Sequence, residues 1–276
     1  MRGRDLRITY YGYNGFIIEA DEHKIAVDPG ANLYIFDLGP VIPRKEWRDV
    51  THVVVTHADP DHYWHADRVA AASGAPIICG SELVERREGK SYIVYPRSGK
   101  ARYDTEVARV YPMNVGDAAH IDGVHFRALP AFHGDLKISL LFGLIMKTVK
   151  REPGELFAMG EMGVLMDVGG VRIANLGDSV FRPEWARMEP DILMVPIGGG
   201  AIKNTMDEAD ALRAVEMIRP SLVIPCHYNC GILFRKRGNP ADAESFKRRV
   251  ERLDIGCAVL ELGESLTYGR AEGRAA

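Results

Sequence analysis

Residues 53–62 read VVVTHADPDH, and this stretch carries the strongest structural signal in the chain. Its first four residues predict a short strand buried on both faces, because continuous apolar runs of this length are typical of such strands. Four residues that can bind a metal follow within six positions: His57, Asp59, Asp61 and His62. Imidazole and carboxylate ligands together suit zinc, iron or manganese. The alternative is the polar start of a helix, with Asp59 or Asp61 as its N-cap residue.

Three more residues of ligand type each follow a predicted apolar strand. They are His133 after the strand 124–129, Asp178 after the strand 171–175, and His227 after the strand 222–225. Taken singly, each is best interpreted as a polar group at the edge of the core. A rigid scaffold presents loops at strand ends, however, so four such positions in one chain favour a shared metal site.

Short strands and helices alternate along the whole chain. Further strands are predicted at 6–11, 16–20, 24–27, 76–79, 163–167 and 192–196, and a helix at 66–73. Gly169 and Gly170 predict a hairpin turn. Thr205 and Glu208 have the spacing of a capping box before a second helix, and Asn239-Pro240 predicts the start of a third, with Pro in its first turn. This order indicates an α/β or α+β fold, and no linker divides the chain, so we expect a single domain over residues 1–276.

Composition excludes several classes of protein. The 276 residues include 35 Lys and Arg against 38 Asp and Glu, a net charge of −3, whereas domains that bind nucleic-acid backbones are usually strongly basic. No apolar run approaches the roughly 18 residues of a membrane span. The N-terminal residues lack the pattern of a secretory signal, and four cysteines are too few for a disulfide framework. We therefore expect a cytoplasmic protein that has no membrane span and binds no nucleic acid.

Taken together, the motifs resemble those of the metallo-β-lactamase superfamily, and more narrowly the branch of ascorbate-6-phosphate lactonase-like and N-acylphosphatidylethanolamine phospholipase D-like hydrolases. The resemblance is carried by Tyr11-Gly12-Tyr13-Asn14-Gly15-Phe16, Val27-Asp28-Pro29-Gly30, the H-x-D-x-D-H loop at 57–62, Pro130-Ala131-Phe132-His133, Gly177-Asp178-Ser179, Asp191 with Pro196-Ile197-Gly198-Gly199, and Pro225-Cys226-His227-Tyr228. It implies a four-layer αββα sandwich with a metal site at one edge of two sheets.

The resemblance also implies a role for each of these ligand-type residues. His57, Asp59 and His133 would bind a first divalent ion, and Asp61, His62 and His227 a second, while Asp178 would bridge the two. Asp61 and Asp178 would be the catalytic carboxylates, and Asp28 would orient a ligand histidine. A metal-bound hydroxide would be the nucleophile, since bound metal lowers the pKa of water from about 15.7 toward 7.

Asp59 is the main departure from the family, which has a histidine at this position. An additional carboxylate makes the first ion a weaker Lewis acid and shifts its preference from zinc toward manganese or iron. Three outcomes follow: an active site with altered metals, a single bound ion, or a weakened enzyme. Tyr13 is a second departure, because the narrower branch often has a histidine after the glycine.

The predicted function is hydrolysis of a lactone or a phosphodiester in a small, anionic substrate. Lys203, Asn204, Tyr228 and Asn229 are candidate substrate contacts. The segment 138–157, apolar and then charged, is interpreted as a core strand or a contact in a homo-oligomer, with an acyl-chain groove or membrane contact as the alternative. Alternative functions are a nuclease on the same fold, a non-catalytic protein whose site Asp59 has altered, and a di-iron protein that handles oxygen.

Overall fold

Two seven-stranded sheets form the centre of the part of the chain that the structure, a computed structural model, describes: residues 5–32, 39–97, 101–140, 145–149, 158–231 and 237–269. The first sheet has the strand order β21-β1-β2-β3-β4-β5-β9. Its strands are β1 (Leu6–Gly12), β2 (Gly15–Ala20), β3 (His23–Val27), β4 (His52–Val55), β5 (Ile77–Gly80), β9 (Val110–Met113) and β21 (Ser265–Tyr268). Antiparallel pairing joins β21, β1, β2 and β3, whereas β3, β4, β5 and β9 run parallel.

The second sheet has the strand order β10-β11-β14-β15-β16-β17-β20. Its strands are β10 (Ala118–Ile121), β11 (Val124–Leu129), β14 (Gly163–Val168), β15 (Val171–Asn175), β16 (Ile192–Pro196), β17 (Leu222–Cys226) and β20 (Gly256–Cys257). β14 and β15 are joined by a two-residue turn at Gly169 and Gly170, both with positive φ, which confirms the predicted hairpin. From β15 to β20 the strands run parallel, so the loops that follow β15 and β17 emerge at one edge of the sheet.

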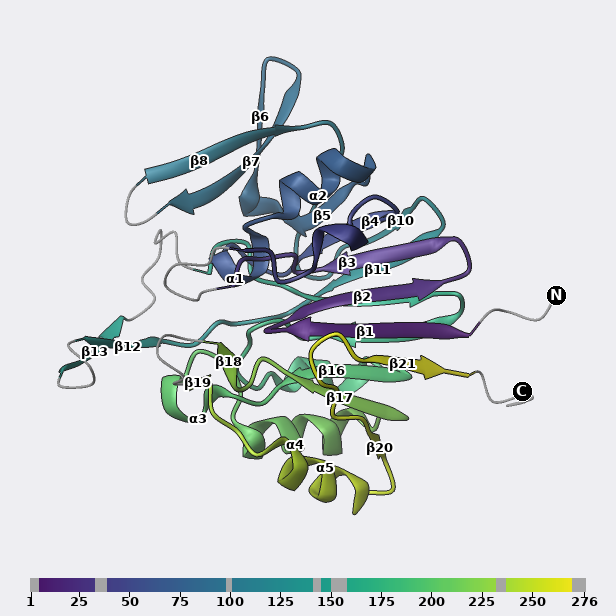
Figure 1. Cartoon of the computed structure of the whole chain (residues 1–276), viewed down its shortest axis with the longest axis vertical. Coiled ribbons are helices and arrows are strands. Elements are labelled where there is room, and N and C mark those ends of the chain that lie inside the picture. The colour runs from purple at the N-terminus through teal and green to yellow at the C-terminus, as the bar shows by residue number, and fades with distance from the viewer. Residues whose placement is uncertain are drawn as a thin grey trace.

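Helices cover the outer face of each sheet (Figure 1). α2 (Ala66–Ser73) packs on β4 and β5 of the first sheet, whereas α4 (Glu208–Ile218) and α5 (Ala243–Glu251) cover β16 and β20 of the second. The short helices α1 (Pro60–Tyr63) and α3 (Gly199–Ile202) lie in the loops that follow β4 and β16. The order helix, sheet, sheet, helix is the αββα sandwich that the sequence predicts.

Apolar side chains fill three layers between these elements. Phe16, Phe126 and Ile224, each at most 1% exposed, belong to the core between the two sheets. Trp185 and Phe246 belong to the core between the second sheet and its helices, and a third core joins the first sheet to α2. Burial of one such side chain contributes about 1.5–3 kcal/mol, so the three cores fix the sheets that carry the site.

Smaller elements project from the sandwich. β6 (Val84–Arg87), β7 (Lys90–Arg97) and β8 (Ala101–Val107) form a three-stranded sheet at the top of Figure 1. β12 (Leu136–Leu140) pairs with β13 (Ile145–Val149), and β18 (Cys230–Gly231) with β19 (Arg237–Gly238). The segment 138–157 therefore includes strand pairing, whereas its residues 141–144 and 150–157 lie outside the described part of the chain.

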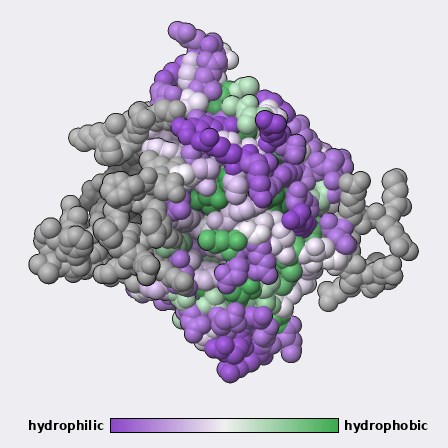
Figure 2. Space-filling model, viewed as in Figure 1, coloured by the Kyte–Doolittle hydropathy of each residue, from purple (hydrophilic) through white to green (hydrophobic). Residues whose placement is uncertain are grey.

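The outer surface is largely polar in the view of Figure 2, both over the three-stranded sheet and over α4 and α5. The described helices include none that combines the length and the apolar character needed to cross a membrane.

Two predicted helix starts are wrong. The N-cap of α4 is Asp207, which accepts hydrogen bonds from the amides of the first helical turn. The hydroxyl of Thr205 is instead buried and donates to the carbonyl of Ser179, 3.1 Å away, so no capping box forms with Glu208. α5 likewise begins after Asp242, whose carboxylate caps it. Pro240 consequently lies before the helix and not in its first turn.

Candidate metal centre

The loop after β4 directs its polar side chains into a buried cluster. Asp59 precedes the first residue of α1, but its side chain makes no capping hydrogen bond. Its Oδ1 instead accepts a hydrogen bond from the amide of Ala158, 3.0 Å away. Asp61 lies within α1 and is itself buried. A short helix therefore does start here with Asp59 at its N-cap position, as the alternative interpretation predicts, but helix capping does not account for the side chains of Asp59 and Asp61.

His57, Asp59 and His133 form what we call the first ligand group. Nε2 of His57 and Nε2 of His133 each lie 3.5 Å from Oδ2 of Asp59. One ligand atom from each residue lies within 4.8 Å of the other two, a spacing that allows a single ion to bind all three. Nδ1 of His133 donates to the carbonyl of Gly134, 2.9 Å away, which leaves Nε2 for the cluster. Asp59 thus reaches the cluster from the position where the family has a histidine.

Asp61, His62 and His227 form the second ligand group. Oδ2 of Asp61 lies 3.5 Å from Nε2 of His62 and 3.4 Å from Nε2 of His227. Asp178 lies between the two groups. Its Oδ2 is 3.0 Å from Nε2 of His227, 3.7 Å from that of His62 and 3.8 Å from that of His133. This position suits a carboxylate that bridges two ions.

Four side-chain atoms of the cluster are buried without a hydrogen-bond partner: Nε2 of His57, Nε2 of His62, Oδ1 of Asp178 and Nδ1 of His227. A buried polar atom left unpaired costs about 1–3 kcal/mol. His57, His62 and Asp178 form a further group of ligand atoms within 4.8 Å of one another. Imidazole and carboxylate are the donors that zinc, manganese and iron accept, so the residues present fit a metal centre.

The charges of the cluster are strongly coupled. Burial opposes ionisation of Asp178, but the imidazoles of His227 and His62 hold the pKa of its carboxyl well below the usual value. Burial likewise opposes protonation of His227, yet Asp178 and Asp61 raise the pKa of this imidazole to about 9. Metal ligands must be deprotonated, so an ion that binds here displaces protons from the histidines.

Asp28 and Thr56 lie behind the ligand histidines. Oδ2 of Asp28 is 2.7 Å from Nδ1 of His62, an arrangement that presents Nε2 to a metal. Thr56 donates to the same carboxylate from its amide and from its hydroxyl, both at 2.7 Å. Its hydroxyl oxygen also lies 3.1 Å from Nδ1 of His57. Sequence reasoning identified Asp28 but missed Thr56, although its place directly before His57 was a usable signal.

The loop 158–161 supports the first ligand group from the other side. Oε2 of Glu161 accepts a hydrogen bond from the amide of His133 at 2.6 Å, and the amide of Ala158 donates to Asp59. The amide of Ala58 donates to Met159, which ties this loop to the ligand loop. Sequence reasoning missed Glu161, because nothing in its local pattern distinguishes it from a surface glutamate.

The four candidate substrate residues have different surroundings. Asn204 is buried and donates to Oδ2 of Asp178, 3.2 Å away, so it orients a ligand. Lys203 is exposed and lies 3.8 Å from the carboxylate of Asp207. Burial raises the pKa of Tyr228 to about 12, and the amide of Asn229 donates to a nearby backbone carbonyl. Substrate contact by Lys203, Tyr228 or Asn229 stays a prediction.

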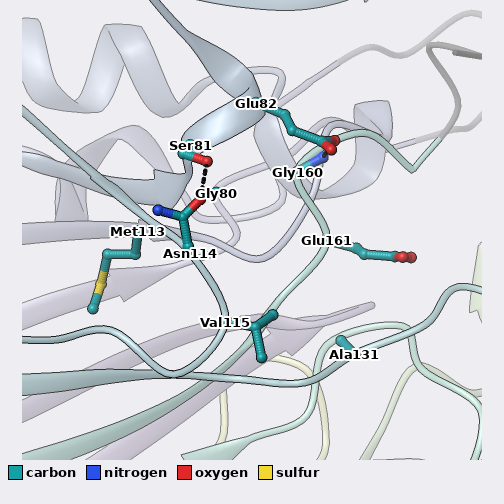
Figure 3. Close-up of a pocket in the computed structure, with 9 residues that line it drawn as sticks. All are labelled: Gly80, Ser81, Glu82, Met113, Asn114, Val115, Ala131, Gly160 and Glu161. Carbon is teal, nitrogen blue, oxygen red and sulfur yellow. Dashed lines mark hydrogen bonds between the residues drawn. The ribbon is translucent and has the colours of Figure 1, made fainter.

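A pocket of about 260 Å³ adjoins the loop 158–161 (Figure 3). Ser81, whose hydroxyl donates to Asn114, lies on one side of it. The carboxylate of Glu161 points away from these two residues in Figure 3, while Glu82 accepts a hydrogen bond from the amide of Gly160. The pocket therefore shares Glu161 with the support of His133, although His133 does not line it, and its charged lining residues are acidic.

This fold and this ligand cluster define a metal-dependent hydrolase of the metallo-β-lactamase type. The chain belongs to the β-lactamase superfamily, whose domain matches residues 7–227. A UPF0173 metal-dependent hydrolase from Archaeoglobus fulgidus is 30% identical over 96% of this chain and 100% of its own length. A second one, from Methanopyrus kandleri, is 27% identical over 94% of this chain and 99% of its own.

Solved structures show the same fold. Igni18, a metallo hydrolase from Ignicoccus hospitalis, has a TM-score of 0.68 at 22% identity and covers 96% of this chain and 99% of its own. CmlA, a diiron β-hydroxylase from Streptomyces venezuelae, has a TM-score of 0.63 at 12% identity, covering 97% of this chain and 55% of its own. At these identities the likeness concerns the fold alone, and it confirms the predicted metallo-β-lactamase fold.

Proposed function

We propose that this protein uses two divalent metal ions to hydrolyse an ester-like bond, in a lactone or a phosphodiester, of a small anionic substrate. The observation that supports this most is the convergence of both ligand groups on Asp178. The first ligand group would hold one ion and the second ligand group the other. The ions would supply an activated water, since bound metal lowers the pKa of water toward 7, and would polarise the substrate oxygen.

The protein groups around the ions have separate tasks in this proposal. The side chain of Asp61 is 11% exposed, and although burial opposes its ionisation, the imidazoles of His62 and His227 hold its pKa well below the usual value. Its ionised carboxylate would hold the second ion and orient the attacking water by accepting a hydrogen bond from it. Asp178 is only 2% exposed and stays ionised, which suits it to hold the two groups at a fixed separation. Asp28 keeps the ring of His62 in place by binding its Nδ1.

Asp59 determines the metal in this proposal. Three carboxylates, Asp59, Asp61 and Asp178, surround the space for the ions, whereas a histidine at position 59 would leave two. The extra negative charge makes the first position harder, which favours manganese or iron over zinc. The contacts of Asp59 with both histidines of its group support a working ligand and argue against an eroded site.

The acidic pocket next to the loop 158–161 limits how a substrate would lie. Its charged lining residues are Glu82 and Glu161, which would repel an anionic group. We therefore place the negatively charged part of the substrate over the metal ions and an uncharged part in the pocket. Its volume of about 260 Å³ suits a small molecule and not a polymer.

Metal content and turnover together test the proposal. The protein would be purified without chelator or metal-affinity resin, analysed by elemental mass spectrometry, and assayed on lactones, phosphodiesters and RNA. About two ions per chain with turnover of a lactone or a phosphodiester is the expected result. Two ions without any turnover would favour a non-catalytic role, and turnover of RNA alone would favour a nuclease.

A variant that has the family's histidine at position 59 provides a second test of the proposal. Asp59→His should shift the ratio of bound metals toward zinc. A large gain of hydrolysis in this variant would show that Asp59 has weakened the enzyme, whereas a loss would show that the site depends on Asp59.

A further inference from the structure

Two buried asparagines link the two sheets behind the metal centre. Asn14 lies in the turn between β1 and β2 and is 1% exposed, while Asn175 is the last residue of β15 and is fully buried. Their side-chain amides exchange two hydrogen bonds. Nδ2 of Asn14 donates to Oδ1 of Asn175 at 2.9 Å, and Nδ2 of Asn175 donates to Oδ1 of Asn14 at 3.0 Å. A reciprocal amide pair therefore joins the first sheet to the second.

The remaining hydrogen-bonding groups of the two asparagines contact residues at the strand ends that carry the ligand groups. Nδ2 of Asn14 also donates to Oδ2 of Asp28, at 2.6 Å, the oxygen that lies against His62. Oδ1 of Asn175 accepts from the amide of Gly177, the residue before Asp178, at 2.9 Å.

A third connection runs to His227. Cys226 directly precedes His227, and its thiol donates to Oδ1 of Asn14, 3.3 Å away. The amide of His227 itself donates to the carbonyl of Tyr13, at 2.7 Å. Three loops that are distant in sequence thus meet at one pair of side chains.

The hydrogen bonds at positions 14 and 175 require side-chain amides. Each carboxamide offers two N–H donors and one oxygen with two lone pairs, and Asn14 uses all four. An aspartate at either position would replace donors by acceptors, and at position 14 it would place a second carboxylate against Asp28. An apolar residue would leave buried partners unpaired.

We propose that Asn14 and Asn175 are positioning residues that set His62, Asp178 and His227 relative to one another, and so determine how tightly the second ion binds. This inference rests on the proposed metal centre. Loss of the pair should weaken the second position more than the first. Asp59 and His133 of the first ligand group take their support from the loop 158–161, whereas His57 reaches the asparagine network only indirectly, through the hydroxyl of Thr56.

The test studies each metal position alone, in a variant that lacks one ligand of the other position. His133→Ala would leave the second ligand group intact, and His227→Ala would leave the first. Asn175→Leu would be added to each background, and the Mn²⁺ affinity of the chelator-stripped proteins would be measured by calorimetric titration. We expect a loss of about 10–100-fold in the His133→Ala background, the range found for partners behind a ligand, and a clearly smaller loss in the His227→Ala background.

A matched control separates positioning from stability. Thr9→Val removes a buried hydroxyl of β1 that bonds Ser265, far along the strand from the cluster, and should leave both affinities unchanged. Equal losses in the two backgrounds, or no loss in either, would overturn the inference. If Asn175→Leu does not fold, Asn14→Ser, which keeps a polar group in the turn, would be measured in its place.

A metal-free readout keeps the inference distinct from the proposed function. The Nδ1 proton of His62, shared with Asp28, should give a ¹⁵N-resolved NMR signal in the stripped protein. We expect Asn175→Leu to shift this signal and Thr9→Val to leave it in place. An unchanged signal in Asn175→Leu would overturn the inference, whether or not the wild-type protein binds metal. Failure of the wild-type protein to bind metal would instead refute the proposed function.

Discussion

The two ligand groups differ in what lies behind them. Behind the second ligand group, Asp28 and the two asparagines form a closed network whose members come from both sheets. Behind the first, Asp59 and His133 are held by hydrogen bonds from the loop 158–161. The second group is therefore held from within the packed sandwich, whereas Asp59 and His133 of the first group are held from a loop. The departure from the family, at Asp59, falls among the residues that this loop supports.

Removal of Asp178 should have the largest effect, because this residue contacts both groups. We expect Asp178→Ala to lower kcat/KM by at least about 10³-fold, equivalent to roughly 4 kcal/mol of transition-state stabilisation. Metal content should fall by at least one ion per chain. Asp167→Ala, on β14 and outside the cluster, is the matched control. Retention of two ions and of activity in Asp178→Ala would refute a bridging role.

Asp28→Asn should weaken the second position more than the first, because Asp28 contacts His62 directly and His57 only through Thr56. Asp28 has φ of 45°, a left-handed conformation that asparagine tolerates, so the backbone is preserved while the charge behind His62 is lost. The affinity for the second ion should fall about 10–100-fold. The measurement is a Mn²⁺ titration of stripped protein in the two single-position backgrounds. An equal loss at the first position would mean that the two groups share their support, contrary to the comparison above.

Glu161→Gln should lower the affinity of the first position for its ion, by less than Asp28→Asn lowers that of the second. The charged hydrogen bond from the amide of His133 becomes a neutral one, a difference of about 1 kcal/mol, or roughly fivefold in the affinity for the first ion. Glu82→Gln is the control, since Glu82 lines the same pocket but bonds Gly160. If both variants behaved alike, the pocket charge and not the hold on His133 would be responsible.

The strands of the sandwich could be predicted largely from sequence because they have distinct apolar runs between turn residues. The four layers could not be predicted from these runs and followed only from the family resemblance. β6, β7 and β8 were missed because their charged residues, such as Arg87 and Asp104, pair across the strands and mask the apolar pattern. The convergence of the ligand residues could be inferred because each follows a strand. The asparagine pair could not. Asn14 lies in the stretch 11–16 that carries the family resemblance, but nothing in that stretch indicates a partner 161 positions away at Asn175.

The smallest predicted effect concerns His52, a buried histidine at the other end of β4 from the ligand loop. Its Nε2 donates to the carbonyl of Ile121, 2.9 Å away. Burial lowers the pKa of His52, although this hydrogen bond opposes the shift. Below about pH 6.5 the unfolded chain therefore binds a proton that the folded chain does not, so the free energy of unfolding falls as the pH falls.

His52→Gln should remove this contribution. Between pH 7 and pH 5, the Tm of the metal-loaded variant should decline less steeply than that of the wild type, by a few degrees at most. Metal content and turnover should be unchanged, because His52 contacts no ligand in the hydrogen bonds and ring contacts described for it. An altered metal content would instead show that the two ends of β4 are coupled, and that the support of the first ligand group extends through the sheet as well as the loop.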